Sequence, residues 1–109
     1  MKKLSLVFKA LSDETRLTIM GLVFRHGHLC VCETERILGI SQSKASRHLR
    51  YLRDAGLLED VRDGAIVNYR LPLETGQGTA PVLEMLRELL SSWPFPEAGP
   101  LLVQMRRTR

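Results

Sequence analysis

The chain has 109 residues, of which 44% are hydrophobic and 26% are charged, as expected for one small globular domain. The formal net charge is +4, and residues 41–53 contain four cations and no acid, which favours a nucleic-acid partner. No apolar run approaches the ~20 residues that span a bilayer, and charged residues interrupt the apolar pattern near the N-terminus. We therefore expect a cytoplasmic protein that has no membrane contact and keeps its cysteines reduced.

Apolar residues recur at helical spacing through the first half of the chain. They predict helices at about residues 4–11, 13–26, 32–38 and 42–55. Ser12 and Ser41 are expected to cap the second and fourth helices, because a hydroxyl there accepts a hydrogen bond from an unpaired backbone N–H. Glycines close three of these helices: Gly27, Gly39 and Gly56.

Strand-like alternation follows the fourth helix. Residues 57–62 and 65–71 predict two strands, and Asp63-Gly64 between them is a strong hairpin signal because glycine accepts a positive φ. A last helix is expected from about Val82 to Trp93, with more apolar residues than one core-facing stripe requires. Three prolines then end regular structure, so residues 101–105 are either a short helical turn or part of a flexible tail.

This order of elements predicts a mainly α-helical winged helix-turn-helix, with five helices and a two-stranded β-hairpin as the wing. We expect residues 1–93 to form a DNA-binding and dimerisation domain and residues 94–109 to form a Pro-containing basic C-terminal tail. A domain of this size reads only a few base pairs, so two copies are expected on a two-fold symmetric site. The first and last helices should form the homodimer interface, because Leu83, Leu90 and Trp93 do not fit on a single core stripe.

The fourth helix is the expected DNA-reading element. Ala45, Leu49 and Leu52 form its core stripe, and polar side chains occupy the opposite face. In the major groove glutamine pairs with adenine and arginine with guanine, whereas serine and lysine suit phosphates. Residues at the hairpin tip are expected over the neighbouring backbone or minor groove. The predicted DNA-binding residues are Gln42, Ser43, Lys44, Ser46, Arg47, Arg50, Arg62 and Gly64.

Both cysteines lie two residues apart, in Leu29-Cys30-Val31-Cys32-Glu33, just before the DNA-reading element. Thiolates are soft ligands that select trivalent metalloids and soft metal ions. Residues i and i+2 of a helix point roughly 200° apart, so an ion bound by Cys30 and Cys32 must reshape the start of the third helix. The pair therefore predicts a sensor in which ligand binding changes DNA binding. A third ligand for a trivalent ion could be water, a small cellular thiol or a cysteine elsewhere in the dimer.

With these residues in view, the chain resembles the arsenic-sensing branch of the ArsR/SmtB family of metalloregulatory repressors. The resemblance covers roughly residues 4–92 and includes the opening helix, the cysteine box, the recognition helix and the second wing strand. The matching segments are Phe8–Leu17, Leu29–Glu33, Ser41–Leu49, Leu52–Leu57 and Val67–Leu71. It implies a repressor that binds operator double-stranded DNA as an apo homodimer and is released by As(III) or Sb(III) bound to Cys30 and Cys32, with no catalytic cofactor.

The chain departs from that family pattern at three places. Glu35 stands where some members have a third cysteine, and Thr34 stands where leucine is common, so we expect a looser third helix. The last helix has Glu84 and Glu88 but no histidine, which argues against the family's zinc site there.

Other functions remain open at this point. His26 and His28 alternate with the two cysteines, so a Zn(II)-, Cd(II)- or Cu(I)-responsive repressor with a mixed site is the main alternative. A further alternative is a regulator of another signal in which the two cysteines are inert. His48 is expected to be a packed helix residue rather than a metal ligand. A thiol enzyme is not expected, because no βαβ scaffold or general base accompanies the thiols.

Overall fold

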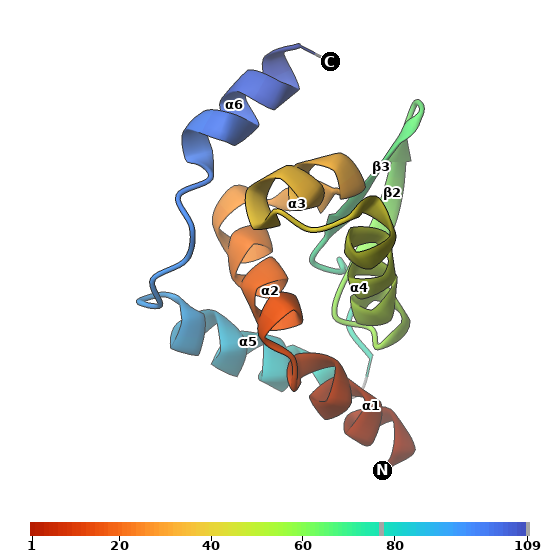
Figure 1. Cartoon of the computed structure of the whole chain (residues 1–109). Coiled ribbons are helices and arrows are strands. Elements are labelled where there is room, and N and C mark those ends of the chain that lie inside the picture. Colours follow the sequence, from red (N-terminus) through yellow and green to blue (C-terminus); the bar gives the residue numbers. More distant parts are fainter. Residues whose placement is uncertain (77, 109) are drawn as a thin grey trace.

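The computed structural model describes residues 1–76 and 78–108, which form six helices and a three-stranded sheet (Figure 1). The elements in chain order are α1 (Lys2–Leu11), α2 (Glu14–His26), β1 (His28–Cys30), α3 (Val31–Leu38), α4 (Gln42–Asp54), β2 (Glu59–Asp63), β3 (Ile66–Arg70), α5 (Thr79–Leu90) and α6 (Gly99–Arg107). Among these described helices, none has both the length and the apolar character that crossing a bilayer requires. The mainly helical winged helix-turn-helix is confirmed, with one helix and one strand more than expected.

A short break separates α1 from α2. Its polar residues cap the end of α1 and the start of α2. The Ser12 hydroxyl donates to the Lys9 carbonyl at the end of α1. Asp13, not Ser12, caps α2, because its carboxylate accepts a hydrogen bond from the backbone N–H of Arg16 at 3.0 Å. The predicted cap was therefore one residue too early, and α2 ends as expected at Gly27, whose φ is +90°.

The sheet has the order β1-β3-β2, and both pairings are antiparallel. The β1 strand was missed because three residues are too few for a period of two to be visible. In the hairpin, Asp63 pairs with Ile66, so the turn residues are Gly64 and Ala65 rather than the predicted Asp63-Gly64. Gly64 takes a φ of +64°, as a tight hairpin turn requires at its first central position.

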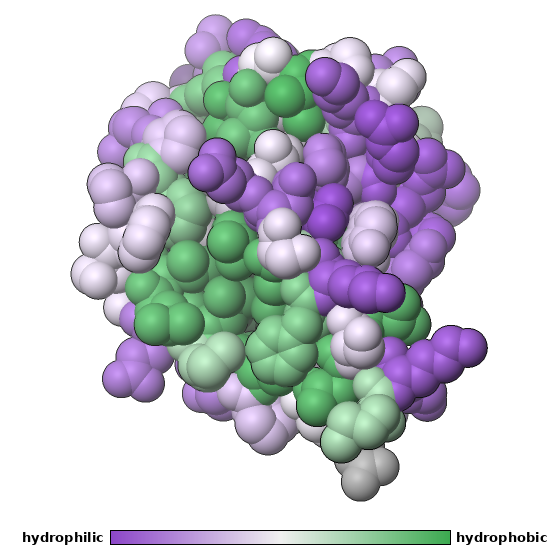
Figure 2. All heavy atoms as spheres, turned by 60° about the horizontal axis from the view of Figure 1, so that its bottom comes forward, coloured by the Kyte–Doolittle hydropathy of each residue, from purple (hydrophilic) through white to green (hydrophobic). Residues whose placement is uncertain are grey.

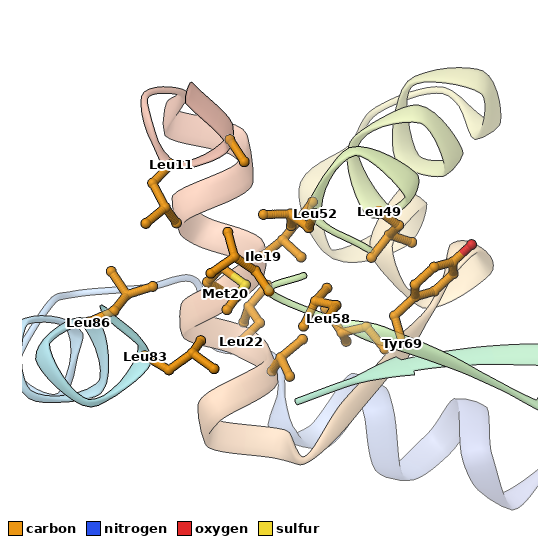
Figure 3. Packing of buried hydrophobic residues seen from close by; sticks show 14 of the residues in the cluster. Leu11, Ile19, Met20, Leu22, Leu49, Leu52, Leu58, Tyr69, Leu83 and Leu86 are labelled. Carbon is orange, nitrogen blue, oxygen red and sulfur yellow. The ribbon is translucent and has the colours of Figure 1, made fainter. Parts of the chain in front are cut away.

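The core is built around α2. Its fully buried Ile19, Met20 and Leu22 lie between the inner side chains of α4 and those of α5 (Figure 3). The predicted core stripe of α4 is buried, and α3 packs against α4. Because α3 begins where β1 ends, the core fixes the cysteine segment relative to α4.

The segment after α5 runs along α2 and leads to α6, which lies beside α3 (Figure 1). The ring of Phe95 covers Gly21 so closely that a Cβ at that position would overlap it. Pro100 falls in the first turn of α6, where proline is tolerated because its missing N–H has no helical partner. The interpretation of this proline as an end of regular structure was thus wrong, and residues 101–105 are helical. The division of the chain at residue 93 stays a prediction.

Candidate DNA-reading face and thiol site

The outer face of α4 carries most of the predicted DNA-binding residues. Ser41 caps the helix, with its hydroxyl oxygen accepting from the N–H of Lys44 at 3.2 Å. A shallow, open hollow on this face is lined by Gln42, Ser43, Ser46, Arg47 and Arg50. Two guanidinium groups, an amide and two hydroxyls thus line one hollow, and groups of these kinds can bind a base edge or a phosphate. Lys44 is exposed on the same first turn, and Arg62 and Gly64 are exposed at the wing tip.

Arg16 of α2 connects α4 to the rest of the protein, a role that the sequence did not reveal. Its Nε donates to the carbonyl of Ala10 at 2.7 Å, and its guanidinium lies 4.1 Å from the ring centroid of Tyr51. Its Nη1 lies 3.3 Å from Nδ1 of His48. One side chain therefore contacts α1 and two residues of α4, which positions the reading helix on the core.

His48 is half-buried on α4, as expected for a packed helix residue, and it contacts Arg16 of α2. Burial lowers its pKa below the ordinary value of 6.5; Asp13 opposes this shift, while Arg16, Arg47 and Lys44 reinforce it. The carboxylate of Asp13 lies 4.0 Å from Nδ1. The imidazole is therefore held mainly in its neutral form near pH 7.

The two cysteines lie on either side of a change from strand to helix. Cys30 is the last residue of β1 and the N-cap of α3, with an extended backbone and a buried side chain. Cys32 is in the first turn of α3, and its side chain is exposed. Because β1 pairs with β3, Cys30 lies opposite Asn68, whose buried Oδ1 has no hydrogen-bond partner within the described residues. One thiol thus faces the interior and the other faces solvent.

Both backbone polar groups of Cys30 are bound by side chains of α3. The N–H of Cys30 donates to Oε1 of Glu33 at 3.0 Å, and the hydroxyl of Thr34 donates to the carbonyl of Cys30 at 2.9 Å. Glu33 and Thr34 are both fully buried. The Thr34 hydroxyl thus binds the residue that precedes the helix, and the expectation of a looser helix stays a prediction.

Glu33 is a buried carboxylate that also binds α6. Nε of Arg106 lies 2.8 Å from Oε2 of Glu33, and Nη2 of Arg106 donates to the carbonyl of His28 at 2.8 Å. Arg106 was expected only as part of a basic tail. No local pattern could have revealed this contact, since 73 positions separate the two residues.

The two histidines that precede the thiols have their own surroundings in the structure. Nδ1 of His28 lies 3.4 Å from Nη2 of Arg106, and His26 is half-buried at the end of α2. Within the part of the chain that the structure describes, no group of three or more potential ligands is close enough to hold a metal ion.

A broad hydrophobic region lies on the face formed by α1 and α5 (Figure 2). Its exposed apolar side chains are Leu4, Phe8, Met85, Leu89 and Trp93. Leu83 and Leu90, which were expected to point outward, are buried instead, because α5 directs its wide stripe onto both the core and this face. Exposed apolar areas of this kind are typical of protein contact surfaces.

Comparison with known proteins places this architecture in a family. Residues 13–60 match the model of the bacterial regulatory protein, arsR family. The arsenic resistance transcriptional regulator ArsR1 of Pseudomonas putida is 44% identical over 93 residues, which cover 85% of this chain and 73% of that protein. The chain belongs to the arsR family of bacterial regulatory proteins. It is a DNA-binding transcriptional repressor of the winged helix-turn-helix class and not an enzyme.

Other relatives carry different names. The arsenical resistance operon repressor of Escherichia coli is 52% identical over 65 residues, covering 60% of this chain and 56% of that protein. The cadmium resistance regulatory protein CadC homolog of Staphylococcus aureus is 43% identical over 65 residues, covering 60% and 54%.

Two solved structures are similar in fold. HlyU of Vibrio cholerae has a TM-score of 0.64 and 31% identity, covering 81% of this chain and 91% of its own. A homodimeric winged helix-turn-helix domain from Mycobacterium bovis has a TM-score of 0.67 and 26% identity, covering 84% and 82%.

Proposed function

We propose that the protein is a metalloid-responsive repressor that binds operator DNA as an apo homodimer and leaves it when As(III) or Sb(III) binds Cys30 and Cys32. The observation that carries this proposal is the position of the two thiols at the junction of β1 and α3. A change at this junction reaches the DNA-reading helix directly, because α3 packs against α4. The names of the arsenic-responsive relatives point to the same inducer.

In this proposal the hollow on α4 reads the major groove. Arg47 and Arg50 suit guanine, Gln42 suits adenine, and Ser43 and Ser46 suit phosphates or base edges. Lys44 supplies a phosphate contact, and Arg62 with Gly64 brings the wing tip to the neighbouring backbone. All of these residues are exposed except Ser46, which is half-buried, and their position on one helix face and one hairpin tip supports the assignment.

The operator complex needs two copies of the chain, and the apolar face of α1 and α5 is the proposed interface. Phe8, Leu89 and Trp93 are each more than half exposed in the single chain, and burying apolar area of this kind stabilises association by roughly 25 cal/mol per Å² before the costs of binding. The homodimeric relative from Mycobacterium bovis supports the same assembly. Two reading helices are then presented to one duplex.

Ligand binding by both thiols requires the junction to change shape. The Cys30 side chain is buried and the Cys32 side chain is exposed, so one ion contacts both sulfur atoms only after Cys30 turns outward or the first turn of α3 unwinds. A trivalent ion then has one remaining position, which a small cellular thiol can fill. The inducer can shift the DNA-binding equilibrium only by its difference in affinity for the two shapes.

A repressor responsive to Zn(II), Cd(II) or Cu(I) through His26, His28, Cys30 and Cys32 is the second candidate. The cadmium-named relative of Staphylococcus aureus favours it, as does the position of His28 at the start of β1. A double His26→Ala, His28→Ala variant separates the two candidates. It keeps its inducer response if the metalloid proposal holds and loses the response if the mixed site is correct.

Arsenite binding to the purified protein, in the presence of a monothiol and measured as bound arsenic per chain, tests the metalloid proposal. The wild type should bind one arsenic per chain, and Cys30→Ser and Cys32→Ser should each lose tight binding. Both variants should still bind operator DNA, because neither thiol lies on the reading face. Retention of tight arsenite binding by the double Cys→Ser variant would refute the proposal.

A further inference from the structure

The contacts around Cys30 extend beyond the residues that bind it directly. Glu33 accepts from the N–H of Cys30, and Thr34 donates to its carbonyl. The guanidinium of Arg106 in turn binds Glu33, with Nε at 2.8 Å from Oε2 and Nη2 at 3.4 Å from Oε1. Its Nη2 also donates to the carbonyl of His28. Arg106 therefore joins a residue before Cys30 to a residue after it.

Burial of the Glu33 carboxylate costs free energy, because this side chain has no exposed surface. The side chain of its partner Arg106 is 28% exposed. A carboxylate in the interior requires a charged partner and hydrogen bonds to remain ionised there. Arg106 supplies two donors in a fork, and the Cys30 N–H supplies another. Each of these groups is therefore held in place by the others.

The helix that carries Arg106 is itself anchored. Ala98 and Leu102 belong to the buried core, and Phe95 packs over Gly21 of α2. The guanidinium of Arg25 stacks 4.5 Å from the centroid of the Phe95 ring and donates to the carbonyls of Leu90 and Trp93. The path from α5 to α6 is thus fixed along α2, so Arg106 reaches Glu33 from a rigid base.

We propose that Arg106 is a positioning residue of the thiol site, which locks Cys30 in its buried position and sets how much inducer is needed to open the site. The bonds from Glu33 and Thr34 hold the backbone of Cys30 in the shape in which its side chain is buried. Because Arg106 stabilises Glu33 in the orientation that binds Cys30, it favours the closed shape. The dependence on inducer rests on the function proposed above, whereas the lock on Cys30 does not.

Alkylation of Cys30 tests the lock without any inducer. In a Cys32→Ser background Cys30 is the single thiol of the chain, and its reaction with iodoacetamide requires exposure of a buried group. Arg106→Gln should raise this rate at least fivefold, because the closed shape loses its charged partner. The matched control is Arg107→Gln, which removes the same charge from an exposed neighbouring position and should leave the rate unchanged. Equal rates in the two variants would overturn the proposal.

A faster reaction must come from local opening and not from general unfolding. Hydrogen exchange of the amides of Ile19 and Leu22 reports the core, and it should be similar in both variants. Exchange at these amides that rises in parallel with alkylation would also overturn the proposal. A Glu33→Gln, Arg106→Gln double variant should react more slowly than Arg106→Gln alone, since no buried charge is left without its partner.

The inducer response provides the second test. On operator DNA, Arg106→Gln should be released at about tenfold less arsenite than Arg107→Gln, a shift within the usual range of coupling between sites, while both bind DNA equally well without arsenite. The same arsenite midpoint in both variants would contradict a role in setting the threshold. Failure of arsenite to release even the wild type would refute the proposed function, and the alkylation result would still decide the lock.

Discussion

Cys30 and Cys32 are two residues apart, yet the first is buried at the N-cap of α3 and the second is exposed on the first turn of that helix. This difference arises because the chain changes from extended to helical backbone between them. A single ion can contact both sulfur atoms only when the backbone between the two cysteines changes shape. In the proposed function the ligand therefore assembles its own site, and that change is passed to α3 and to α4, which packs against it.

The two thiols should differ strongly in reactivity in the native protein. Cys32 should be alkylated at least tenfold faster than Cys30, because only Cys30 requires an opening of the structure before reaction. Mass spectrometry of the alkylated peptides after short exposure to iodoacetamide measures both rates. Arsenite added beforehand should protect both residues together, whereas protection of Cys32 alone would exclude a site shared by the two thiols.

Arg47 and Lys44 should contribute to DNA binding in different ways. Arg47→Ala should weaken operator binding and reduce discrimination against base changes by about 1–3 kcal/mol. Lys44→Ala should weaken binding to all sequences equally and lower the salt slope by about one. Titrations of operator and scrambled duplexes at several salt concentrations measure both effects. An unchanged sequence preference in Arg47→Ala would remove this residue from base reading.

Loss of the Arg16 side chain should destabilise the protein. Arg16→Met keeps much of the aliphatic stem but removes the hydrogen bonds to Ala10 and His48, and it should lower the free energy of unfolding by about 1–2 kcal/mol. Urea denaturation measures this change, and Lys3→Met on the exposed side of α1 is the control. Equal stability of the two variants would show that the Arg16 contacts do not hold α4 on the core.

The lowered pKa of His48 predicts a pH-dependent stability. The unfolded state binds a proton at higher pH than the folded state does, so stability rises with pH through this interval. The contribution is complete above about pH 7 and is lost as the pH falls through 6.5 toward the lower pKa of the folded state. His48→Gln should flatten the dependence of unfolding free energy on pH between about 7 and 5. A dependence equally steep in the variant would assign it to other groups.

The hydrophobic face of α1 and α5 predicts the assembly state. The wild type should sediment as a dimer at micromolar concentration, and Leu89→Glu should sediment as a monomer with at least tenfold weaker operator binding. Val103→Glu, which places the same charge at an exposed apolar position on α6, should remain dimeric. A monomeric wild type, or dissociation by both variants, would contradict the proposed interface.

Local patterns in the sequence were sufficient to predict much of this fold. The core stripe of α4 and the glycine at the hairpin turn follow from periods of 3.6 and 2 residues and from backbone conformation. The β1 strand has only three residues, so no alternation of apolar and polar residues reveals it. Its hydrogen-bond partner lies on β3, far away in the sequence. In the same way, Ser12 and Asp13 are both good capping residues, and only the geometry of the chain selects Asp13.

The thiol site illustrates a different limit of sequence reasoning. The cysteine pair was evident from its spacing, and its closeness to the reading element predicted a sensor. The lock formed by Glu33, Thr34 and Arg106 was not evident, because it depends on a helix that returns to the site from the end of the chain. A glutamate next to a cysteine pair indicates such a lock only when its distant partner, here Arg106, is known.

The most direct measurement of the central claim is fluorescence anisotropy of a labelled DNA fragment from immediately upstream of the protein's own gene. As(III), Sb(III), Zn(II), Cd(II) and Cu(I) would each be added to the preformed complex under reducing conditions. Release by As(III) or Sb(III), lost in both Cys30→Ser and Cys32→Ser, is the predicted result. Release only by a divalent ion or Cu(I), or release by arsenite that persists without the two thiols, would contradict the account.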